Sequence, residues 1–275
     1  MMPVFPAARR AIAATVSSSA SQAACRSAVP TVFSRSVTKF SAPIGGYESE
    51  QVRPKLFIPG PIEFSPEVLK ANGAGARAHT DTTLIEDFGK CLEMTRKAFV
   101  TKDGQPFLVS GSGALGWDVV ATNLISEGGK VLVTNTGFFC TRFENCLRQF
   151  RNDITSISAP NPGARVNIQE VEKALKDAKA NGKPFEAITI THVDTSTAVL
   201  ADLKEMCAMV QATSPDTLII VDAVCSAAGE ELRMDEWGVD FVLTGSQKAF
   251  GVPPGLSIMI ASQKAMSRLL PKDKV

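Results

Sequence analysis

Two charged side chains follow runs of apolar, β-branched residues in this sequence. Asp222 comes directly after the run at 217–221, and Lys248 lies a few residues beyond the run at 241–243. Such runs are typical of buried strands, where a charge is costly unless it is paired or used in chemistry. A structural salt bridge between Asp222 and Lys248 is the simpler interpretation, and a functional pair is the alternative.

A glycine-rich turn follows a third apolar run, at 107–109. The sequence Ser-Gly-Ser-Gly at 110–113 places small residues where a strand would pass into a helix. Backbone N–H groups in such a turn can close on an anion at the helix N-terminus, and the hydroxyls of Ser110 and Ser112 add donors. We expect a phosphate group here, with a purely structural tight turn as the alternative.

The same turn contains the pattern G-x-G-x-x-G at Gly111, Gly113 and Gly116. This pattern occurs in nicotinamide dinucleotide folds, which also need an acidic residue at the end of the next strand to hold the ribose hydroxyls. The next apolar run, at 130–133, is followed by Thr-Asn-Thr-Gly, with no acid. A NAD-binding oxidoreductase therefore remains an alternative supported by the glycines alone.

A phosphate cradle, an acid and a lysine are together the three anchors that pyridoxal phosphate needs. A lysine amine can form the Schiff base, and an acid can keep the pyridine nitrogen protonated so that the ring withdraws electrons. The sequence thus predicts pyridoxal 5′-phosphate as the cofactor, with Lys248 and Asp222 as its partners.

The elements that position these residues alternate between two patterns. Buried strands are expected at 107–109, 130–133, 187–190, 217–221, 241–243 and 256–260, and amphipathic helices at 83–99, 114–126, 141–150, 168–180 and 203–213. Alternating strands and helices predict an α/β fold with a mostly parallel sheet and helices on both faces. Ligands are then expected beyond the carboxyl ends of the strands.

Composition excludes several other classes of function. The 275 residues are 44% hydrophobic and 21% charged, which is ordinary for a globular protein, and the net charge of +1 offers no field that would recruit nucleic acid or a membrane surface. Two histidines and six cysteines without a C-x-x-C pair argue against a metal site. No apolar run is long enough to span a bilayer.

The N-terminal segment differs from the rest of the chain. It has no acidic residue before Glu48, but it is rich in serine, alanine and arginine. This profile is typical of a mitochondrial transit peptide, which we assign to residues 1–45, with a disordered tail as the alternative. Residues 46–275 are then expected to form the cofactor-binding domain.

Six motifs carry a resemblance to a known family. They are Phe-Ile-Pro-Gly-Pro at 57–61, Ser-Gly-Ser-Gly at 110–113, Gly-Phe-Phe at 137–139, Thr-His-Val-Asp-Thr-Ser-Thr at 191–197, Val-Asp-Ala-Val at 221–224, and Gly-Ser-Gln-Lys-Ala at 245–249 with Pro-Pro-Gly at 253–255. In order and spacing the chain resembles the class V (fold-type I) aminotransferases, in particular their alanine-glyoxylate and serine-pyruvate group. Cysteine desulfurases, which are related in architecture, carry a histidine immediately before the lysine, where this chain has Gln247; a cysteine-desulfurase-like or other class V enzyme is the alternative that the resemblance allows.

The resemblance implies roles for residues around the cofactor ring. Lys248 is expected to be the Schiff-base lysine, and Asp222 the partner of the pyridine nitrogen. Thr195 is expected to hydrogen-bond the ring near its phenolic oxygen. Val224 is expected to lie against one face of the ring and Phe139 against the other, where the family usually has tryptophan.

The resemblance also implies how the phosphate is held. Ser112, Gly113 and Gln247 are expected to bind it. The family usually continues the turn with a polar residue such as histidine, where this chain has Ala114, so one phosphate contact is expected to be missing.

The activity implied is transamination from alanine or serine to glyoxylate or pyruvate, so the partners are small amino acids and 2-oxo acids, with no nucleic acid and no membrane. A homodimer is implied for the full-length protein. The family also has a smaller C-terminal domain with an arginine that clamps the substrate carboxylate. Because the sequence ends at Val275, we expect this domain to be missing, and a catalytically dead fragment is an alternative. A mitochondrial location is expected, with a peroxisomal or cytoplasmic one as the alternative.

Other residues receive simpler interpretations. His192 is expected to be a half-buried histidine whose hydrogen bonds are satisfied, and His79 either a substrate contact or part of a helix-capping loop. Cys225, Trp117 and Trp237 are expected to serve packing.

Overall fold

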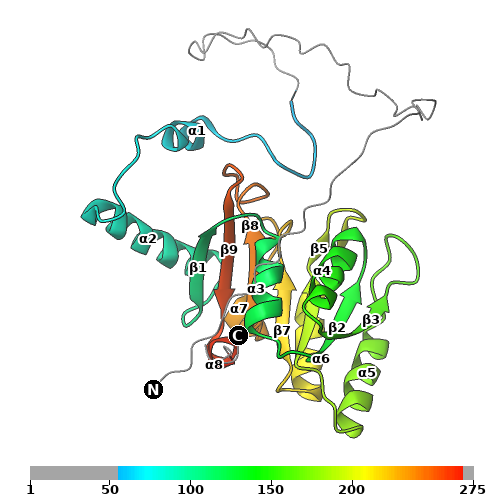
Figure 1. Cartoon of the computed structure of the whole chain (residues 1–275). Coiled ribbons are helices and arrows are strands. Elements are labelled where there is room, and N and C mark those ends of the chain that lie inside the picture. The colour runs from blue at the N-terminus through cyan, green and yellow to red at the C-terminus, as the bar shows by residue number, and fades with distance from the viewer. Residues whose placement is uncertain (1–54, 269–275) are drawn as a thin grey trace, which may run out of the picture. The chain divides into compact units, whose positions relative to one another are not determined.

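A central sheet organises the computed structural model, which describes residues 55–268. Its seven strands lie in the order β1-β9-β8-β7-β4-β2-β3. They are β1 (Gln105–Ser110), β2 (Lys130–Asn135), β3 (Asp153–Ser158), β4 (Ala187–Thr191), β7 (Leu218–Asp222), β8 (Phe241–Gly245) and β9 (Leu256–Ala261). Strand β9 is antiparallel to both neighbours, and the other six strands point the same way (Figure 1). The mostly parallel sheet expected from the sequence is confirmed.

The central strands are buried along their whole length because both faces of the sheet are covered. Every residue of β4, β7 and β8 is buried. In the register of these strands, Thr191 lies opposite Asp222, and Asp222 opposite Leu243. The carboxyl ends of the three strands therefore meet at one edge, which places Asp222 next to the segment that follows β8.

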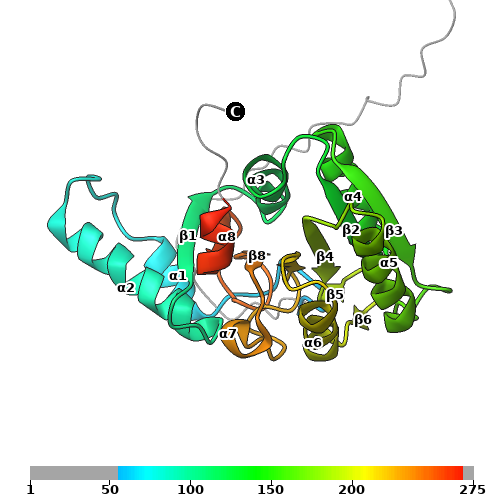
Figure 2. The same ribbon diagram turned by 90° about the horizontal axis from the view of Figure 1, so that it is seen from below.

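Helices flank the sheet on both faces, as expected. The described helices are α1 (Pro66–Asn72), α2 (Thr82–Ala98), α3 (Leu115–Asn123), α4 (Phe138–Gln149), α5 (Ile168–Ala180), α6 (Leu203–Thr213), α7 (Met234–Trp237) and α8 (Gln263–Ser267). Figure 2 shows α3 and α4 on one side of the sheet, and α6 and α7 on the other. A short two-stranded ribbon, β5 (Val193–Asp194) with β6 (Val199–Leu200), follows β4.

Each face of the sheet has its own hydrophobic core. Val120 of α3 and Phe143 of α4 pack with Val131 of β2 in one core. Leu175 of α5 and Val210 of α6 pack in the other. Alternate residues along the strands divide between the two cores, as the pleat of a strand requires.

The expected elements are present with small shifts in their ends. All six expected strands form, and α5 and α6 have the expected bounds. Helix α4 begins at Phe138 rather than at residue 141, and strand β3 was not expected at all. Strand β3 is at the edge of the sheet and half exposed, so its polar residues give no continuous apolar run.

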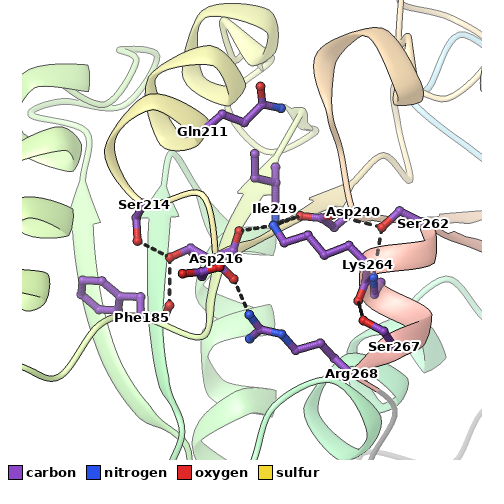
Figure 3. A network of polar contacts seen from close by, with 12 residues as sticks. Phe185, Gln211, Ser214, Asp216, Ile219, Asp240, Ser262, Lys264, Ser267 and Arg268 are labelled. Atoms are coloured by element: carbon purple, nitrogen blue, oxygen red, sulfur yellow. Dashed lines mark hydrogen bonds and ion pairs between the residues drawn. The ribbon is translucent and has the colours of Figure 1, made fainter.

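Figure 3 shows a polar network at the amino-terminal edge of the sheet. Asp222 lies at the other end of β7. Asp240, just before β8, accepts hydrogen bonds from Ile219 N (2.9 Å) and Ser262 Oγ (3.0 Å). It also pairs with Lys264 Nζ at 3.0 Å, and Lys264 donates to the carbonyl of Thr217. This network ties α8 to β7 and β8, so Lys264 has a structural role.

Residues 1–45, the expected transit peptide, lie outside the described residues. The described cysteines are all free thiols, and no described helix is long and apolar enough to cross a membrane.

Candidate active site

A cavity of about 230 Å³ lies at the carboxyl edge of the sheet. All eight residues predicted for the cofactor site line it: Ser112, Gly113, Phe139, Thr195, Asp222, Val224, Gln247 and Lys248. Ala114, Trp117, Thr191, Val193 and Cys225 complete the wall. Segments spread over more than 130 residues of sequence thus meet at the place where the strand pattern predicted a ligand.

Asp222, the last residue of β7, is a buried carboxylate with 2% of its surface exposed. Burial raises its pKa from 3.8 to about 6, although hydrogen bonds from the Val224 N–H and the Trp117 indole work against that rise. The Val224 nitrogen lies 3.0 Å from Oδ1, and Trp117 Nε1 lies 2.8 Å from Oδ2. Asp222 is therefore a carboxylate that binds a proton more readily than an exposed aspartate does, and it is held in one orientation.

Lys248 is half-buried on the segment after β8. Gly60 lies against it, and a Cβ at residue 60 would come within 2.4 Å of Lys248 Cδ. Neither Lys248 nor Asp222 forms an ion pair with any group in residues 55–268, whereas Lys264 pairs with Asp240. The simpler interpretation, a structural salt bridge between Asp222 and Lys248, is wrong within this part of the chain.

The turn at residues 111–114 presents unpartnered donors to the cavity. Helix α3 begins without a side-chain cap. Among the described residues, the backbone N–H groups of Ser112, Gly113 and Ala114 donate to no acceptor. Gly113 is needed because a Cβ there would lie 2.8 Å from Val224 Cγ2. A glycine-rich helix N-terminus of this kind binds a phosphate or another anion.

The sequence analysis missed a second buried acid, Asp194, which has no exposed surface. Its Oδ2 accepts from the backbone N–H groups of Phe139 (3.0 Å) and Cys140 (3.1 Å), and its Oδ1 accepts from Ser196 Oγ (2.6 Å). Burial raises its pKa, but the hydrogen bonds from Ser196 and Cys140 outweigh burial and hold the pKa below its ordinary value. Asp194 therefore stays ionised and fixes the first turn of α4, which carries Phe139.

The residues predicted to contact the ring lie around the cavity wall. Phe139 is 37% exposed, and its ring meets that of Phe138 edge to face. Thr195 Oγ1 forms a hydrogen bond with Cys225 Sγ. Cys225 also lines the cavity. The contacts of Phe139, Thr195 and Val224 with a ring remain predictions.

The predictions for the two histidines and the two tryptophans are confirmed to different extents. His79 is exposed in the loop before α2 and does not line the cavity, and Asp81 caps that helix. His192 is buried, at 3% exposed, rather than half-buried, and its Nδ1 has no hydrogen-bond partner in residues 55–268, so both parts of the expectation are wrong. Both tryptophans are buried as expected, but Trp117 also binds Asp222.

These residues fit pyridoxal phosphate. The free N–H groups at the start of α3 suit its phosphate, and the unpaired basic carboxylate of Asp222 suits its pyridine nitrogen. The amine of Lys248, without an acidic partner among the described residues, suits its aldehyde carbon. The fold and the donor set together define a pyridoxal-phosphate-dependent enzyme domain of fold type I.

Comparison with known sequences assigns the family. The sequence model of aminotransferase class V matches residues 67–273, so the chain belongs to that family, and its cofactor is pyridoxal 5′-phosphate. It is 42% identical over 225 residues to alanine-glyoxylate aminotransferase 1 of Saccharomyces cerevisiae, a match that covers 80% of this chain and 57% of that protein. It is 31% identical over 214 residues to serine-glyoxylate aminotransferase of Arabidopsis thaliana, covering 78% and 53%.

A solved structure agrees with this assignment. The alanine-glyoxylate aminotransferase of Nostoc sp. superposes with a TM-score of 0.71 at 26% identity, covering 80% of this chain and 57% of that one. The chain spans about half the length of the curated relatives it matches. Family membership also excludes the dinucleotide interpretation of Gly111, Gly113 and Gly116, whose turn follows the edge strand β1.

Proposed function

We propose that the protein to which this chain belongs catalyses transamination from alanine to glyoxylate, giving pyruvate and glycine. One observation carries this proposal. A buried carboxylate and a half-buried lysine, both without ion-pair partners in residues 55–268, share a cavity with an uncapped helix N-terminus. Because unpaired buried charges are costly, their presence in one cavity supports a role in chemistry.

The proposed roles follow from the position of each group. The N-terminus of α3, with Ser112 and Gln247, binds the phosphate. The carboxylate of Asp222 holds a proton on the pyridine nitrogen, and Phe139 and Val224 keep the ring between them. When bound, the cofactor supplies an electron sink for the carbanion left at the substrate's Cα. Lys248 Nζ would remove the Cα proton of the amino donor and pass it to the cofactor carbon bonded to the amino nitrogen, and in the second half-reaction it would carry a proton in the reverse direction to the Cα of the new amino acid.

Glyoxylate is the better supported of the two substrates. The relatives named above carry glyoxylate in their names with alanine or serine as the donor, and a further one, from Paracoccus denitrificans, is an L-aspartate-glyoxylate aminotransferase at 35% identity. The acceptor is thus shared while the donor varies. Alanine is proposed as the donor because the relative from S. cerevisiae, at 42% identity, acts on alanine by name.

The exposed apolar residues of α2 support a second copy of the chain as the partner, in a homodimer. Ile85, Phe88 and Met94 are 58%, 47% and 56% exposed on this one helix. Large apolar side chains gathered on one exposed element mark an interface. We propose that a second copy of the chain covers them.

A mitochondrial location is also proposed. It is supported by the arginine- and serine-rich segment without acids at residues 1–45. Fusion of these residues to a fluorescent protein tests it directly. Import into mitochondria is expected, and a diffuse cytosolic signal would contradict it.

The transamination is tested with the purified full-length protein to which this chain belongs, together with pyridoxal phosphate, alanine and glyoxylate, by measuring pyruvate and glycine. We expect both products in equal amounts from the wild type, none from Lys248→Ala, and wild-type amounts from Lys204→Ala, an exposed lysine of α6. Products from Lys248→Ala at the wild-type rate would contradict the role of Lys248. Cofactor binding without products from alanine or serine would contradict the proposed reaction.

A further inference from the structure

Both oxygens of the Asp222 carboxylate accept hydrogen bonds from donors whose positions are fixed by the fold. Oδ1 accepts from the backbone N–H of Val224 at 3.0 Å, and Oδ2 accepts from the indole Nε1 of Trp117 at 2.8 Å. Trp117 is 8% exposed, and it lines the cavity beside Asp222. A buried hydrogen bond to a charged acceptor is stronger than one between neutral groups. The indole is therefore placed to fix both the charge and the direction of this carboxylate.

The position of the indole is determined by its packing. Its ring stacks on Phe143 of α4, with the centroids 5.6 Å apart and the planes at 14°. Phe143 is 1% exposed, so the stack has no room to slide. Tryptophan offers a large flat surface for this contact and one N–H for the polar end.

A neighbouring glycine brings α3 close enough for the hydrogen bond to form. Gly116 is buried against β8, and a Cβ at this position would lie 2.7 Å from Leu243 Cβ. Since Leu243 is opposite Asp222 in the sheet, any larger residue at 116 would push α3 away from β7 and β8. The third glycine of the G-x-G-x-x-G pattern thus sets the approach of Trp117 to Asp222.

We propose that Trp117 is a positioning residue, which keeps Asp222 ionised and aimed at the pyridine nitrogen of the bound cofactor. The inference deepens the proposed function and rests on its assignment of Asp222 to the ring nitrogen. A proton lies between the pyridine nitrogen and the Asp222 carboxylate. Without the indole N–H, this proton moves from the ring nitrogen toward Asp222. The ring then becomes a weaker acceptor of electrons, and the cofactor is bound less tightly.

Trp117→Phe tests the inference, because phenylalanine keeps an aromatic surface against Phe143 and removes the donor together with part of the buried ring system. Trp237→Phe is the matched control, since Trp237 is equally buried but its Nε1 has no partner in residues 55–268. We expect Trp117→Phe to weaken the affinity for pyridoxal phosphate about tenfold or more, the usual effect of losing a hydrogen bond to a charged group. Trp237→Phe is expected to bind like the wild type.

A second readout distinguishes positioning from a loss of packing. With cofactor labelled with nitrogen-15 in the ring, the resonance of the pyridine nitrogen should move toward the neutral form in Trp117→Phe and stay unchanged in Trp237→Phe. In a double-variant cycle, Trp117→Phe should add nothing to the defect of Asp222→Asn, because its effect passes through that carboxylate.

The outcomes separate the inference from the proposed function. Trp117→Phe with wild-type affinity and an unchanged nitrogen resonance would overturn the inference, as would a penalty that adds fully to that of Asp222→Asn. If Trp117→Phe fails to fold, Gly116→Ala replaces it, and unchanged affinity and resonance in that variant would overturn the inference equally. A wild type that binds no pyridoxal phosphate would instead contradict the proposed function.

Discussion

The carboxylate of Asp194 caps the helix that carries Phe139. Asp194 Oδ2 accepts the backbone N–H of Phe139 at 3.0 Å, which joins the end of the β5 strand to the first turn of α4. Gly137 permits this approach, because a Cβ there would lie 2.7 Å from the Asp194 carboxylate carbon. A buried anion at a helix N-terminus is stabilised by the helix dipole. The charge of Asp194 thus stabilises the part of the cavity wall that carries Phe139.

Asp194→Asn should lower the free energy of unfolding by about 1 to 3 kcal/mol, because the amide NH₂ would face the N–H groups of Phe139 and Cys140. The pKa of Asp194 is held below its ordinary value, so the wild type's advantage should be present above the ordinary carboxyl pKa and lost as the pH falls through the folded-state pKa. Urea unfolding of the apoprotein at several pH values measures both effects. Asp153→Asn, an exposed acid, is the control, and equal losses in the two variants would contradict the capping role.

The buried carboxylate of Asp222 should lower the free energy of unfolding of the apoprotein at neutral pH. Its pKa is raised by burial from 3.8 to about 6, so the folded chain binds a proton more readily than the unfolded chain within that interval. Stability falls as the pH rises through it, by about 3 kcal/mol in total. The free energy of unfolding of apo Asp222→Asn, which does not titrate, should therefore rise relative to the wild type by about that amount between about pH 4 and pH 7. Parallel pH profiles for the two proteins would contradict a raised pKa.

His192 should change the stability of the apoprotein in the opposite direction as the pH is varied. Burial lowers its pKa from 6.5 to about 4, so the unfolded chain binds the proton more readily, and stability is lost as the pH falls from 6.5 toward 4. His192→Gln should remove about 3 kcal/mol of this acid sensitivity. His79→Gln serves as the control for removing a histidine. An unchanged acid limb in His192→Gln would mean that the imidazole is not neutral in the folded protein. Because Asp222 and His192 act oppositely, the wild-type profile alone conceals both.

Much of the candidate site could be predicted from the sequence, because parallel strands bring their carboxyl ends to one edge. The apolar runs before Asp222, Lys248 and the glycine turn at 111–113 mark that edge without any long-range information. The eight predicted residues accordingly line one cavity.

The hydrogen bonds that position these residues could not be predicted, because they depend on contacts between segments distant in the sequence. Trp117 and Asp222 are 105 residues apart, and Phe139 and Asp194 are 55 apart. A tryptophan at helical spacing looks the same in sequence whether its N–H is satisfied by a carboxylate or, like that of Trp237, has no partner in residues 55–268. The absence of an ion pair between Asp222 and Lys248 likewise follows from side-chain directions that spacing does not give.

Identification of the lysine that holds the cofactor tests the central claim most directly. The wild-type chain is loaded with pyridoxal phosphate, reduced with borohydride and digested, and the modified peptide is located by mass spectrometry. The site described here predicts the pyridoxyl group on Lys248, since Lys264 is paired with Asp240 at the opposite edge of the sheet and Lys204 is exposed on α6. A label on Lys264 or Lys204 in place of Lys248 would contradict the assignment of this cavity as the active site.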